Sequence, residues 1–133
     1  MSESDRLKYL RVALRALSVM FIVGYYPLTV AWPSGWAWQT GHSEYQQMMI
    51  GIYATLGVFV WLASRDPVRH VSLISFAIWS SIVHALIMAV QSIVNAQHVG
   101  HLYGDVPVLL VVAAVLAWLS PQALTFRFAR DAA

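Results

Sequence analysis

The chain has 133 residues, of which 59% are hydrophobic and only 11% are charged. Soluble domains carry about a quarter charged residues, so this composition argues against a soluble globular fold, against intrinsic disorder and against a nucleic-acid partner. The formal net charge is +2, and the absence of cysteine excludes disulfides, thiolate metal sites and a cysteine nucleophile. We expect a single integral membrane domain over residues 1–133, with the lipid bilayer as its first partner.

Four apolar runs, separated by short polar stretches, predict four membrane-spanning helices. A bilayer core of about 30 Å needs about 20 helical residues, so the first and third runs are ample. The second and fourth cross the bilayer only with little tilt or with help from their polar ends. The predicted fold is therefore an all-α transmembrane four-helix bundle, with spans at about 12–32, 46–63, 71–94 and 106–119.

Basic residues fall on one side of this arrangement. The loops on the other side, residues 33–43 and 95–104, contain neither Lys nor Arg. The positive-inside rule then predicts that both termini and the turn with Arg65 and Arg69 lie in the cytoplasm. The eight basic residues are Arg6, Lys8, Arg11, Arg15, Arg65, Arg69, Arg127 and Arg130.

Prolines predict where the helices bend and end. Pro27, close to Gly24, predicts a kink about two thirds of the way along the first span. Pro67 disfavours helical geometry at the residue before it, so the second helix is expected to end there. The fourth helix is expected to end in the same way before Pro121.

An ionisable group at membrane depth is costly, which makes His84 the first candidate for a functional residue. It lies 13 residues into the third span, about 20 Å from the start of that helix at 1.5 Å per residue. Helical spacing places it on a polar stripe that is expected to face protein. The stripe consists of Ser80, Ser81, His84, Met88, Gln91 and Asn95.

The second span offers a face that could meet this stripe. There Gly51 is expected to allow close approach of the third span, with His84 near Gly51 and Thr55. Asp105, at the start of the fourth span, lies toward the same side of the membrane. The candidate ligand-binding residues are His84, Glu44, Gln47, Gln91, Asn95 and Asp105.

Three interpretations of this cluster stay open. His42, His98 and His101, with neighbouring carboxylates, form a candidate metal site, or else they are ordinary interfacial histidines. His84 could donate a hydrogen bond to a quinone or a lipid-like ligand. Alternatively, it bonds a Ser, Gln or Glu of a neighbouring helix and stabilises helix packing.

Part of the chain resembles a known group of membrane proteins. Gly51-Ile-Tyr53, Leu56-Gly57, Ala63-Ser-Arg65-Asp-Pro67 and the segment from His84 to Met88, together with Glu44, resemble small DoxX-like proteins of the bacterial inner membrane. The resemblance covers roughly residues 44–120 and implies a four-helix fold. Some relatives of that broader group are described as quinone-linked redox subunits, so the resemblance favours a quinone ligand. The cysteines of several such proteins are missing here, and no catalytic residue is carried over.

The sequence favours a small non-enzymatic accessory or assembly subunit, in a homo-oligomer or a larger membrane complex. No Gly-rich phosphate loop, Gly-x-Ser-x-Gly elbow or helical His-Glu-x-x-His is present. The alternative is a quinone-, lipid- or metal-binding, redox-associated subunit that uses a polar pocket around His84. No particular cofactor is indicated.

Overall fold

The computed structural model describes residues 1–38 and 43–125. Every regular element in this part of the chain is a helix, which confirms the predicted all-α class. In chain order these are α1 (Glu3–Val19), the π-helix η1 (Met20–Gly24), α2 (Tyr25–Ala31), α3 (Pro33–Trp36), α4 (Glu44–Arg65), α5 (Val71–Val94), the 3₁₀-helix η2 (Ala96–Leu102), α6 (Asp105–Leu119) and the 3₁₀-helix η3 (Pro121–Leu124).

Four helical stretches within the described residues are long and apolar enough to cross a membrane. They confirm the predicted number of spans, but the first begins earlier than expected. Helix α1 starts at Glu3, because the side chain of Ser2 caps it by accepting a hydrogen bond from the backbone N–H of Asp5. The four stretches are Glu3–Ala31, Glu44–Arg65, Val71–Val94 and Ala96–Leu119.

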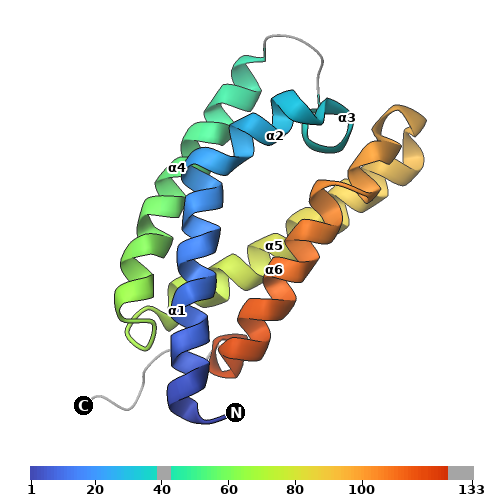
Figure 1. Ribbon diagram of the computed structural model, residues 1–133. Coiled ribbons are helices and arrows are strands. Elements are labelled where there is room, and N and C mark those ends of the chain that lie inside the picture. The colour runs from blue at the N-terminus through green and yellow to red at the C-terminus, as the bar shows by residue number, and fades with distance from the viewer. Residues whose placement is uncertain (39–42, 126–133) are drawn as a thin grey trace.

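The first span changes helix type ahead of Pro27. Because proline has no N–H to donate, it removes one bond of the regular α-helical pattern. The chain forms the π-helical segment Met20–Gly24 just before this point, a common way to accommodate a bend. As a result α2 turns away from the axis of α1 and leans toward α6, which realises the predicted kink (Figure 1).

The predicted helix ends before proline are also observed. Helix α4 ends at Arg65, and Asp66 takes a non-helical conformation before Pro67. Helix α6 ends at Leu119, and Ser120 takes a non-helical conformation before Pro121.

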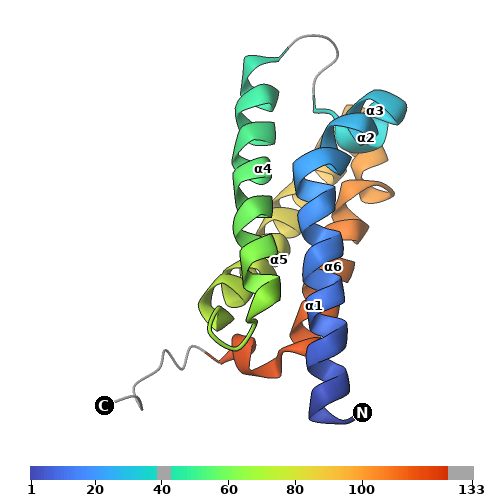
Figure 2. The same ribbon diagram turned by 60° about the vertical axis from the view of Figure 1, so that its left-hand side comes forward.

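The helices are arranged as two pairs. Helix α1 packs along α4, helix α5 packs along α6, and α1 also contacts α6. By contrast, α4 and α5 contact each other little, and they diverge from the turn that joins them (Figures 1 and 2). The bundle is therefore splayed open between α4 and α5.

The main apolar core lies toward the end of the molecule that carries the N-terminus and the α4–α5 turn. We call this the basic end, because Arg6, Arg65 and Arg69 lie there, and we call the opposite end, with α3 and η2, the histidine end (Figure 1). The core unites side chains from both helix pairs. It includes Leu10, Leu14, Val60, Ile74, Ile78, Leu116 and Leu119.

Close contact between α1 and α4 depends on Gly57. The hydroxyl of Ser18 donates a 2.7 Å hydrogen bond to the carbonyl of Gly57, and a Cβ at that position would lie 2.8 Å from Ile22. The close approach expected at Gly51 is wrong, since nothing lies within 4 Å of a Cβ built there. The reason is that α4 packs its Gly57 face on α1 and leaves Gly51 beside the open side of the bundle.

At the histidine end, α3 docks on η2 through backbone contacts that only glycine permits. A Cβ at Gly100 would collide with the carbonyl of Ser34, and one at Gly104 with the carbonyl of Gly35. Residues 95–104 were expected to form a loop, but most of them form η2. Docking of α3 on η2 joins the two helix pairs where α4 and α5 are furthest apart (Figure 1).

Candidate functional site: the cleft between α4 and α5

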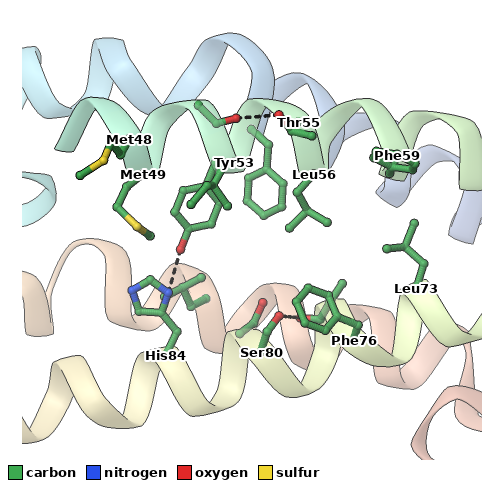
Figure 3. A pocket seen from close by; sticks show the side chains of 16 residues that line it. Met48, Met49, Tyr53, Thr55, Leu56, Phe59, Leu73, Phe76, Ser80 and His84 are labelled. Carbon is green, nitrogen blue, oxygen red and sulfur yellow. Dashed lines mark hydrogen bonds between the residues drawn. The ribbon is translucent and has the colours of Figure 1, made fainter. Parts of the chain in front are cut away.

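The divergence of α4 and α5 leaves a cleft of about 800 Å³. Its walls are mostly apolar side chains that reach inward from both helices (Figure 3). Toward the basic end the lining is purely apolar, with Leu56 and Phe59 on α4 facing Leu73 and Phe76 on α5.

One hydrogen bond crosses the cleft. The hydroxyl of Tyr53 and Nδ1 of His84 lie 2.7 Å apart, joining α4 to α5 near the middle of both helices (Figure 3). Three other hydroxyls line the cleft, and two of them, those of Thr55 and Ser80, donate to carbonyls of their own helices. The Tyr53–His84 pair is the polar contact that joins the two walls of the cleft.

The pair leaves one hydrogen-bonding atom available. In the tautomer where the phenol of Tyr53 donates to Nδ1, the proton of the His84 ring is on Nε2. Within the described residues Nε2 has no partner. It can therefore donate to a carbonyl oxygen, or accept from a hydroxyl in the other tautomer.

Aromatic packing positions Tyr53. The centroid of its ring lies 5.2 Å from the ring centroid of Phe21 and 5.5 Å from that of Tyr25. Both of these residues belong to the bent first span. Tyr25 in turn meets the edge of buried Trp36 in α3. The π-helical bend and the docking of α3 therefore determine where the phenol of Tyr53 points.

Toward the histidine end the cleft continues into a more polar region of about 700 Å³. Tyr53 and His84 line both regions and mark the boundary between them. The side chains that make this region polar include Tyr45, Gln46, Gln91 and Trp38. The cleft as a whole is apolar at the basic end and becomes more polar toward the histidine end.

Behind the pair, inside the bundle, lies a cavity of about 40 Å³ lined by His84, Tyr53, Tyr25 and Asp105 among others. Its size suits a water molecule better than an organic ligand. Oδ2 of Asp105 is 2.9 Å from Nδ1 of His101, whereas its buried Oδ1 has no hydrogen-bond partner in the described part of the chain.

His101 is almost completely buried, with 1% of its surface exposed. Its ring stacks on Trp38 at 4.2 Å. The interpretation of His101 as a solvated interfacial histidine is therefore wrong. Helix η2 places its ring under Trp38, in the segment that follows α3. Trp36 of α3, at the same end of the molecule, is buried as well.

The predicted ligand-binding residues are only partly brought together. His84 and Asp105 line the same small cavity, and Gln91 lines the polar part of the cleft. Glu44 and Gln47 lie exposed at the start of α4, and the side chain of Asn95 caps η2 by accepting from the N–H of Gln97.

The predicted metal site is not assembled in the part of the chain that the structure describes. His42 lies outside the described residues, and the rings of His98 and His101 are 6.0 Å apart. Among residues 1–38 and 43–125, no group of three or more His, Cys, Asp or Glu side chains could hold a metal ion. Because His42 is not among these residues, the metal site stays a prediction.

Sequence reasoning missed Tyr53 as the partner of His84. Tyr53 lies one helical turn before Gly57 and two turns before Val60. It therefore belongs to the face of α4 that packs on α1. A hydroxyl on an otherwise apolar packing face was the available signal. The predicted face, with Gly51 and Thr55, lies beside His84 at the expected level and lines the cleft.

Fold and site together define a small multi-pass α-helical membrane protein with a cleft between two helix pairs. The chain belongs to a family of unknown function, DUF6632, whose model matches residues 4–131. Comparison with curated proteins and with solved structures gave no match. The DoxX-like resemblance is not tested by the family match and stays a prediction.

Proposed function

We propose that the protein binds a lipid-soluble amphiphile of the quinone class in the cleft between α4 and α5. The observation that carries this proposal is the hydrogen-bonded Tyr53–His84 pair, which links two walls that are mostly apolar. A polar group at membrane depth is costly unless it is used, so a pair with one spare nitrogen favours a ligand.

The chemistry of a quinone matches the spare nitrogen. A quinone carbonyl accepts a hydrogen bond, and the corresponding quinol hydroxyl donates one. Nε2 of His84 serves either form through a change of tautomer, with Tyr53 adjusting as donor or acceptor.

Size and polarity support the same class of ligand. Pockets for small molecules typically measure about 300–1,000 Å³, and the cleft of about 800 Å³ falls in this range. The polar region beyond His84 suits the ring with its oxygens. An apolar tail would then lie toward Phe59 and Phe76, and the open side of the bundle gives entry from the bilayer.

The direct test is titration of purified protein in detergent with decylubiquinone, followed by quenching of intrinsic fluorescence. His84→Ala is expected to weaken binding about fivefold to tenfold, since a hydrogen bond contributes about 1 kcal/mol. Ser80→Ala, which removes a hydroxyl already bonded to its own helix, is the matched control and should change affinity less than twofold. Non-saturable quenching, or equal affinity for the wild type and His84→Ala, would overturn the proposal.

We also propose that the protein lies in a bacterial inner membrane with both termini in the cytoplasm. Within the described residues, all Lys and Arg side chains belong to α1 or to the end of α4 and the turn after it, at the basic end. This distribution supports the orientation through the positive-inside rule. Arg127 and Arg130 lie outside the described residues.

A second candidate function is an accessory or assembly subunit whose partner inserts a helix into the cleft. It is favoured by the exposure of large apolar side chains such as Phe59 and Phe76 on the facing walls. A photoreactive benzoylphenylalanine in place of Phe76 distinguishes the candidates in native membranes. A crosslink to one defined protein, or to a second copy of the chain, favours a subunit role, and a crosslink to a lipid-soluble small molecule favours ligand binding.

A further inference from the structure

A second groove, of about 900 Å³, lies at the basic end, far from the Tyr53–His84 pair. It runs between the first turns of α1, the start of α5 and η3. Two arginines from separate parts of the chain line it, Arg6 from α1 and Arg69 from the turn before α5. Glu3 is the carboxylate among its lining residues.

Arg6 contributes a hydrogen-bond donor that the described part of the chain does not use. Its Nε is buried and has no hydrogen-bond partner there. Arg69 is exposed, and its Nε lies 3.2 Å from a carboxylate oxygen of Asp66. A guanidinium carries five N–H donors, so this contact leaves most of those of Arg69 for an anion.

The wall below the arginines is apolar. Leu10 and Leu119 are buried, and Val71 lies beside them at the start of α5. Both arginines lie at the same end of the membrane-spanning stretches Glu3–Ala31 and Val71–Val94. A basic rim above an apolar wall at the end of a span corresponds to the level of the lipid phosphates.

We propose that this groove binds the headgroup of an anionic phospholipid. The phosphate is held by Arg6 and Arg69, because guanidinium groups match phosphate oxygens in geometry and charge. The first carbons of an acyl chain lie along Leu10 and Val71. This site is independent of the proposed function, since it shares no lining residue with the cleft between α4 and α5.

The test is native mass spectrometry of delipidated protein mixed with equal amounts of phosphatidylglycerol and phosphatidylcholine. The wild type is expected to retain phosphatidylglycerol preferentially. The double variant Arg6→Gln/Arg69→Gln is expected to lose about 25-fold in that preference, about fivefold for each arginine.

The matched control is Lys8→Gln/Arg11→Gln, which removes the same charge from α1 outside the groove. It should keep the preference of the wild type. Equal loss in both double variants would overturn the proposal, because it would indicate diffuse attraction. Inorganic phosphate that displaces the lipid at equal concentration would overturn the assignment to a phospholipid. The midpoint of unfolding in phosphatidylcholine alone verifies that each variant is folded.

Discussion

At the scale of single residues, the site depends on a few side chains that are paired inside the membrane. Tyr53 is fixed by aromatic neighbours and bonds His84, while Asp105 bonds the buried His101. The Tyr53–His84 pair joins α4 to α5, and the His101–Asp105 pair joins η2 to the start of α6. Removing one member therefore affects both packing and the binding surface.

Tyr53→Phe is expected to lower the free energy of unfolding by about 0.6 kcal/mol, the average found for hydrogen bonds within a membrane. It removes the bond to His84 and keeps the ring packing on Phe21. Unfolding in mixed detergent micelles measures the effect. Tyr45→Phe is the control, because Tyr45 is 69% exposed, and it should leave stability unchanged. An equal loss in both variants would contradict the assigned role of the hydrogen bond.

Asp105→Ala is expected to destabilise the protein by about 1–3 kcal/mol, because it leaves Nδ1 of His101 buried without its hydrogen-bond partner. Asp105→Asn should cost less, since the amide oxygen can still accept from Nδ1. Asp66→Ala breaks an exposed ion pair with Arg69 and is expected to cost about 1 kcal/mol or less. Similar losses for Asp105→Ala and Asp66→Ala, measured by the same unfolding assay, would refute the importance of the buried pair.

At the scale of helices, glycine positions decide which faces meet. Gly57 lets α1 and α4 approach, and the hydrogen bond from Ser18 stabilises that contact. Gly100 and Gly104 let α3 dock on η2. Between these contacts α4 and α5 are joined by the Tyr53–His84 hydrogen bond and otherwise contact each other little, so the cleft lies where no glycine brings helices together.

Gly57→Ala is expected to cost about 1–3 kcal/mol of stability, since its Cβ would crowd Ile22 and the backbone of α1. Gly51→Ala is the matched control on the same helix. No atom lies within 4 Å of its Cβ, so stability should stay the same or increase. Thermal unfolding of both variants in detergent decides the matter. A neutral Gly57→Ala, or a damaging Gly51→Ala, would show that the packing of α1 on α4 is different.

At the scale of the whole molecule, the two ends differ in chemistry. The basic end holds the arginine-lined groove and the main core, whereas the histidine end holds buried His101 and the polar part of the cleft. A multi-pass chain with this asymmetry is expected to have one fixed orientation in the membrane.

The orientation is testable with single cysteines, because the chain has none of its own. In intact cells a membrane-impermeant maleimide is expected to label Tyr103→Cys, a position 73% exposed at the histidine end. Arg69→Cys, at the basic end, should react only after the cells are permeabilised. Labelling of Arg69→Cys alone in intact cells would reverse the proposed orientation.

Local sequence features predicted much of the helical framework. Apolar runs predicted the four spans, and Pro27, Pro67 and Pro121 predicted a bend and two helix ends, because these depend on the residue itself and its near neighbours. His84 was singled out because an ionisable group within a span is costly wherever the helix packs.

What the sequence by itself determined is therefore the number of spans, their approximate limits and the position of His84 within the third span. Tertiary structure alone decided that Gly57, not Gly51, sits at a close helix contact, that Tyr53 is the partner of His84, and that Glu44 and Gln47 lie away from the cleft. The physical reason is that helical spacing determines which residues share a face, whereas the neighbour of that face depends on packing along the whole chain. Here the bend before Pro27 and the docking of α3 on η2 join the first span to the α5–α6 pair at the histidine end, while α4 and α5 diverge and leave the cleft between them.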